Sequence, residues 1–84
     1  MEKRYLLRKC GSGSRPLPID CFAASNMTEA QEALKWLREH HPERQELHLG
    51  PGEFFELLVE EHCPPEEWEE ALAELEHNRA KKSD

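Results

Sequence analysis

Lysine and arginine are absent between residues 45 and 78, a stretch that contains eleven glutamates. Long apolar runs are absent too: no window approaches the roughly 18 apolar residues of a membrane span, and the N-terminus lacks the apolar run of a signal peptide. The three cysteines are an odd number with no close pairing, which excludes a disulfide framework and favours a reducing compartment. We therefore expect a cytoplasmic protein.

Motifs for catalysis and cofactor binding are also missing. The Gly-Ser loop at residues 11–14 is followed by Pro16 and an expected strand rather than by a helix N-terminus, so it does not fit a phosphate-binding loop. The histidines and cysteines form no Cys-x-x-Cys or His-x3-His pair, so we expect no metal and no cofactor. We also expect no cleft of several hundred Å³ in so small a core, and hence no enzyme.

The charge that is present is unevenly distributed. Residues 1–44 and 79–84 each carry a small positive balance, so the net charge of −7 comes from residues 45–78. A negative field repels nucleic acid and anionic membranes, and it attracts basic protein surfaces. We expect no direct nucleic-acid binding, no membrane binding, and a larger protein partner with a basic surface.

The apolar pattern predicts a single acidic α+β domain over residues 1–84. Alternation predicts strands at 3–10 and 17–24, with Tyr5 and Leu7 on one face of the first strand and Leu6 on the other. A helix should follow, with Thr28 and Gln31 as its capping box and with its end before Pro42. A third, short strand at 46–49 and a turn at 50–52 would complete a three-stranded β-β-α-β sheet with the strand order 2-1-3.

Two C-terminal helices are predicted at 53–62 and 65–78, followed by a frayed tail at 79–84. The second helix is amphipathic, because Trp68, Ala71, Leu72 and Leu75 fall on one side of it. The first helix would carry apolar residues around about 200° of its circumference, more than one packing partner covers. It would either lie between the sheet and the last helix or present part of its surface to another chain.

Candidate contact residues are of two kinds. Trp36 falls off the apolar stripe of its helix, so a half-exposed indole is expected there unless another helix or a loop covers it, and exposed tryptophan is common among binding hot spots. Like-charged glutamates four residues apart cost stability in a helix, and a basic partner would offset that cost. The predicted partner-binding residues are Trp36, Glu56, Glu60, Glu66, Glu67, Glu70 and Glu74.

Two functions of different classes fit these observations. The first is a small non-enzymatic binding protein that docks on a basic surface of a larger, nucleic-acid-handling protein complex and inhibits or modulates it. In size, charge and lack of catalytic motifs, the chain resembles the small inhibitors that phages carry against host defence, including anti-CRISPR proteins and DNA mimics. A basic first strand, with Lys3, Arg4, Arg8 and Lys9, departs from an evenly acidic mimic. The alternative is a homo-oligomeric structural or regulatory subunit, antitoxin-like, packed through the helix at 53–62.

Overall fold

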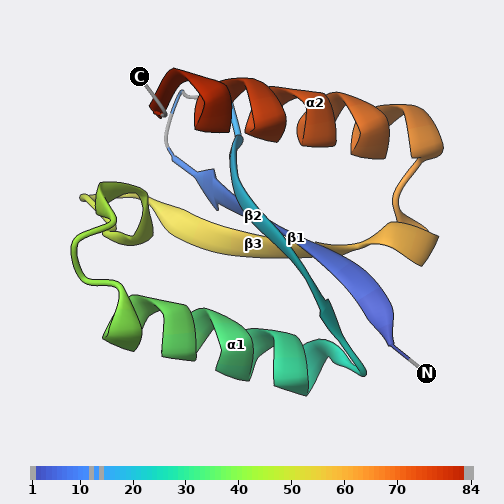
Figure 1. The fold of residues 1–84 in the computed structure, drawn as a ribbon, viewed down its shortest axis with the longest axis horizontal. Helices are drawn as coiled ribbons and strands as arrows, with labels where there is room; N and C mark the ends of the chain where they lie inside the picture. The colour runs from blue at the N-terminus through green and yellow to red at the C-terminus, as the bar shows by residue number, and fades with distance from the viewer. Residues whose placement is uncertain (1, 12, 14, 83–84) are drawn as a thin grey trace.

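The protein has three layers, with one helix on each face of a small sheet (Figure 1). The computed structural model describes residues 2–11, 13 and 15–82. The elements, in order, are β1 (Lys3–Cys10), β2 (Leu17–Ala24), α1 (Met27–His40), the 3-10 turn η1 (Gln45–Leu47), β3 (Phe54–Val59), the 3-10 turn η2 (Glu60–His62) and α2 (Pro65–Lys82). The predicted α+β class with a three-stranded sheet is confirmed.

β1 is the central strand of the sheet. It pairs antiparallel with β2 on one side and with β3 on the other, so the order β2-β1-β3 is as predicted. In the β1–β2 ladder Leu7 lies opposite Asp20 and Arg8 lies opposite Pro18, which makes Ile19 the extra residue of a β-bulge. The β1–β3 ladder runs without interruption.

The third strand lies later in the chain than predicted. Residues 46–49, expected as a strand, contain most of η1, and the expected helix at 53–62 is β3 followed by η2. Apolar side chains on all sides of a segment are typical of a strand that is covered on both faces, and that pattern was mistaken for an over-apolar helix. Phe55, Leu57 and Val59 pack toward α1, whereas Leu58 packs toward α2.

Two separate apolar cores lie on the two faces of β1. Leu6, with no exposed surface, packs against Trp68, Ala71 and Leu75 of α2. On the other face, Tyr5 and Leu7 pack in the core beneath α1. The predicted alternation of β1 and the predicted apolar side of α2 are both confirmed.

The N-cap of the first helix lies two residues before the predicted one. Asn26 is its N-cap: the Asn26 side chain accepts a hydrogen bond from the Glu29 N–H (2.9 Å), and the Glu29 carboxylate accepts one from the Ser25 N–H (2.8 Å). Asn26 and Glu29 therefore replace the predicted box of Thr28 and Gln31. The helix ends at His40, ahead of Pro42 as predicted.

A tight turn leads into β3, and a long helix ends the described chain. The Glu53 N–H donates to the Gly50 carbonyl (3.1 Å), and Gly52 has a φ of 78°. With Pro51 before it, this is a type II turn, which needs glycine at that position. The last helix, α2, is helical through Lys82, although we expected it to end at Asn78. Residues 83 and 84 of the expected tail lie outside the described residues.

Candidate protein-binding surface

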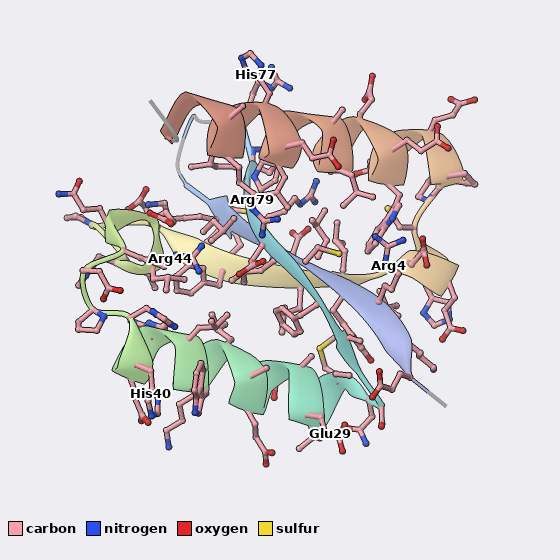
Figure 2. The ribbon with its side chains drawn as sticks, viewed as in Figure 1. Arg4, Glu29, His40, Arg44, His77 and Arg79 are labelled. Carbon is pink, nitrogen blue, oxygen red and sulfur yellow. The ribbon has the colours of Figure 1, made fainter. Side chains whose placement is uncertain are left out.

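The outward side of α2 is acidic. While Trp68, Ala71 and Leu75 face the sheet, four exposed glutamates lie on the opposite side of the helix. Within the described part of the chain these four form no ion pair: Glu66, Glu69, Glu70 and Glu76. We call them the α2 acidic face. His77 points away from the sheet on the same helix (Figure 2).

The other glutamates of the acidic stretch are largely neutralised within the chain. Basic side chains of β1 and of the loop after it reach five of them: Arg8 with Glu56 and with Glu67 (3.5 Å), Arg4 with Glu60 (3.4 Å), Lys3 with Glu61 (2.6 Å), and Arg15 with Glu74 (3.9 Å). Four predicted contact residues, Glu56, Glu60, Glu67 and Glu74, therefore have a counter-charge of their own. Most of the cations that supply this counter-charge belong to the basic first strand, β1.

Arg8 is the most buried of these cations, with 14 % of its side chain exposed. Burial lowers the pKa of its guanidinium, but the hydrogen bond and charge of Glu56 outweigh burial and leave the pKa raised. The Cys10 thiol donates weakly to the same carboxylate (3.9 Å). Burial, and then Glu56, raise the pKa of Cys10. This thiol is therefore held protonated and is not an activated nucleophile.

Trp36 is half exposed, as predicted, with 52 % of its surface accessible. Its ring stacks on His40 at a centroid distance of 4.2 Å and meets the edge of His41 at 5.8 Å. No helix or loop of the described chain covers it. However, Trp36 belongs to α1, and the sheet separates α1 from α2 (Figure 1). The predicted contact residues therefore do not form one surface.

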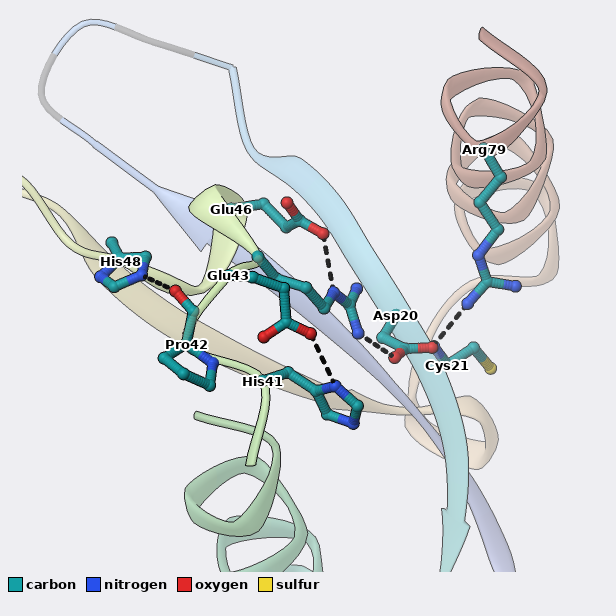
Figure 3. A network of polar contacts seen from close by, with 9 residues as sticks. Asp20, Cys21, His41, Pro42, Glu43, Glu46, His48 and Arg79 are labelled. Atoms are coloured by element: carbon teal, nitrogen blue, oxygen red, sulfur yellow. Dashed lines mark hydrogen bonds and ion pairs between the residues drawn. The ribbon is translucent and has the colours of Figure 1, made fainter. Parts of the chain in front are cut away.

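The sequence did not reveal an ion network at the outer edge of β2 (Figure 3). Asp20 contacts Arg79 of α2 through one carboxylate oxygen (2.6 Å) and Arg44 through the other (3.3 Å). Arg44 also donates from its Nε to Glu46 (2.8 Å). Arg79 approaches from α2, and Arg44 approaches from the loop ahead of η1 (Figure 2). The one available signal was a carboxylate in the middle of an otherwise apolar strand.

A hollow of about 790 Å³ lies beside this network. Our expectation that so small a chain would have no such cleft was wrong. Its lining combines an apolar side (Leu17, Pro18, Ile19, Leu75) with a polar side (Glu43, Arg44, Gln45, Glu46, Asn78, Arg79). Both arginines are already engaged with carboxylates. Among the described residues that line it there is no serine, cysteine or histidine, and so no nucleophile beside a base.

The described residues bring no three metal-ligating side chains together. None of their helices is long and apolar enough to cross a membrane. Comparison with protein-family models, curated proteins and solved structures found no match. The basis for a functional proposal is therefore the surface of the molecule itself.

Proposed function

We propose that the protein is a small non-enzymatic binding protein whose α2 acidic face docks on a basic surface of a larger, nucleic-acid-handling protein complex and inhibits or modulates it. The observation that supports this proposal is that some glutamates of the acidic stretch form ion pairs within the chain and others do not. The chain's own cations pair with Glu56, Glu60, Glu61, Glu67 and Glu74, whereas the α2 acidic face has no counter-charge within the described chain.

Unfavourable charge pairs on α2 support a binding role over a role in solubility alone. Glu66 and Glu70 lie one turn apart, where two like charges cost a few tenths of a kcal/mol. A solubilising surface intersperses both signs, whereas this face carries one sign. A basic partner surface would turn the repulsion into attraction and would speed association in a salt-dependent way.

The shape of the acidic face fits a surface that otherwise holds nucleic acid. The acidic face of this helix runs from Glu66 to Glu76, about 15 Å along the helix axis, so its carboxylates form a row of negative charge like a short length of phosphate backbone. Occupation of a basic groove by this row would exclude nucleic acid, as a phage anti-defence inhibitor of the DNA-mimic type would do. Trp36, on the other side of the sheet, is proposed as a separate contact. The three free cysteines favour a cytoplasmic site of action.

The first test compares two charge-reversed variants. The Glu70→Lys variant changes the α2 acidic face, and the Glu2→Lys variant makes the same change in net charge at an exposed position ahead of β1, away from both α2 and Trp36. Each is used to capture proteins from lysate of the source organism. We expect the wild type and the Glu2→Lys variant to retain a nucleic-acid-binding protein that the Glu70→Lys variant loses. Equal capture by both variants would remove the α2 acidic face from the proposal.

The second test uses the captured partner once it is purified. Added nucleic acid should displace the wild-type protein, and the affinity should fall as the salt concentration rises, because the contact is between opposite charges. Binding that is insensitive to both salt and nucleic acid would contradict the proposed mode of docking.

A further inference from the structure

The two outer edges of the sheet differ in how open they are. The edge of β2 is obstructed at several points. Pro18 has no N–H to offer, and the bulge at Ile19 interrupts the strand. The Cys21 N–H is occupied by the Asp20 carboxylate (2.8 Å), and the network of Figure 3 brings two arginine side chains to that carboxylate. These are features by which proteins prevent another strand from adding to an edge.

The edge of β3 has none of these features. Its sequence, FFELLV, contains no proline, glycine or lysine, and its ladder with β1 has no bulge. Within the described chain, no backbone hydrogen bond from outside the sheet reaches this strand. Residues 55–59 are only partly buried, whereas Leu6 and Leu7 of the neighbouring β1 are fully buried. An open, apolar edge of this kind is a template for strand pairing.

The register of the sheet shows which backbone groups of β3 face outward. The Cys21 N–H turns to a side chain and not to β1, and Cys21 lies opposite Leu6. Because backbone groups alternate in direction along an antiparallel ladder, those of Leu6 face β3, where Leu58 lies opposite. The alternate residues Phe55, Leu57 and Val59 therefore direct their N–H and C=O groups away from the sheet.

We propose that β3 pairs antiparallel with β3 of a second copy of this chain, with Leu57 opposite the partner's Leu57. This register matches every outward-facing residue with another, since Phe55 then lies opposite the partner's Val59 and Val59 opposite the partner's Phe55. An aromatic side chain opposite a β-branched one is a favourable cross-strand pair. The two sheets become one continuous sheet, and the apolar row beneath each α1 continues into the other.

A second copy fits this edge because the strand is complementary to itself. Its only charged side chain, Glu56, is neutralised by Arg8 and lies opposite the partner's Leu58 in this register, so like charges do not meet. The first residue of the strand, Phe54, also exposes an apolar side chain (56 %). A two-fold arrangement uses the same patch twice. The inference does not depend on the proposed function.

Sedimentation and light scattering on the full chain test this inference. We expect the wild type to be a dimer at tens of micromolar, and added salt should not weaken it, because both copies carry the same net charge. Leu57→Pro removes an outward N–H and should give a monomer. Ala23→Pro makes the same change at an exposed position of β2 and should remain a dimer. Circular dichroism checks that each variant is folded.

A wild-type monomer throughout this concentration range would overturn the inference, as would a folded Leu57→Pro variant that remains a dimer. If Leu57→Pro does not fold, hydrogen exchange of the wild type decides. The amides of Phe55, Leu57 and Val59 should exchange more slowly at high than at low protein concentration, and rates that do not change with concentration would overturn the pairing.

Discussion

Lys3, Arg4 and Arg8 of β1 each lie beside a glutamate from the acidic half of the chain. These ion pairs differ in how much they contribute to the stability of the fold. The two pairs made by Lys3 and Arg4 are about half exposed, and surface pairs of that kind contribute about 0–1 kcal/mol. Arg8 is much less exposed, so its loss would leave the Glu56 carboxylate without its cation in a partly buried site. Among the three cations, Arg8 therefore contributes most to the stability of the fold.

The pair of Lys3 with Glu61 can be followed by titration. The hydrogen bond from Lys3 lowers the pKa of the Glu61 carboxyl. Burial opposes this shift, and the positive charge of Lys3 adds to it. A carboxyl whose pKa is lower in the folded than in the unfolded state stabilises the fold above the unfolded pKa, and that contribution is lost as pH falls through the folded pKa. We expect Lys3→Met to raise the Glu61 pKa, measured by NMR of the side-chain carboxyl.

Glu43 is the internal control for this titration. Its pKa is lowered by a hydrogen bond to its own backbone and by His41, both remote from Lys3 in sequence. It should therefore titrate identically in the wild type and in the Lys3→Met variant. A Glu61 pKa that is the same in both proteins would show that the ion pair does not form in solution.

At the scale of the elements, two residues compete as the N-cap of α1. The structure assigns the cap to Asn26, and the sequence pattern had assigned it to Thr28. Loss of an N-cap side chain costs about 1 kcal/mol. Asn26→Ala should therefore lower the free energy of unfolding by about that amount in urea titrations, whereas Thr28→Ala should change it by less than about 0.5 kcal/mol. The reverse ranking would support the cap at Thr28.

Two elements could be predicted with their buried faces. The apolar residues of β1 are a short run between two charged pairs, Lys3-Arg4 and Arg8-Lys9, which suits a strand with Tyr5 and Leu7 on one face and Leu6 on the other. The helix α2 places Trp68, Ala71 and Leu75 on one side. β3 was not recognised because its short apolar run fits a buried helix as well as a buried strand, and only its pairing with β1 distinguishes the two.

The candidate site was predicted in part for the same reason. The exposed row that contains Glu66 and Glu70 follows from the period of α2. The pairing of Glu56 and Glu67 with Arg8 joins residues far apart in sequence, and only the ladder between β1 and β3 brings Arg8 opposite Glu56. The Asp20 network likewise needs a bulge and two helical layers to form.

For the whole molecule, the sheet separates the two candidate contact surfaces. The α2 acidic face and the stacked Trp36–His40 pair lie on opposite sides, so one flat partner surface cannot contact both. Asp20 contacts Arg44 at the start of η1 and Arg79 near the end of α2, which makes this carboxylate a bridge between the layers. In the proposed dimer, both α2 helices would lie on the same side of the joined sheet.

The contribution of the Asp20 bridge to the free energy of unfolding can be measured. Its side chain is 17 % exposed, and hydrogen bonds that involve charged groups contribute about 1.5–3 kcal/mol when they are shielded from solvent. We expect Asp20→Ala to lower the free energy of unfolding by about 1–2 kcal/mol, toward the lower end because Arg79 is largely exposed. The control, Glu69→Ala on the exposed side of α2, should change it by less than about 0.5 kcal/mol. Equal stabilities of the two variants would contradict the bridging role.

The central position of β1 also governs when the chain can fold during its synthesis. In the chain, β1 comes before its second neighbour, β3, and before α2, which covers Leu6. The hairpin of β1 and β2 is therefore synthesised before the elements that cover its apolar faces. Closure of the sheet needs β3 and α2, so this nascent hairpin is the segment most in need of a chaperone.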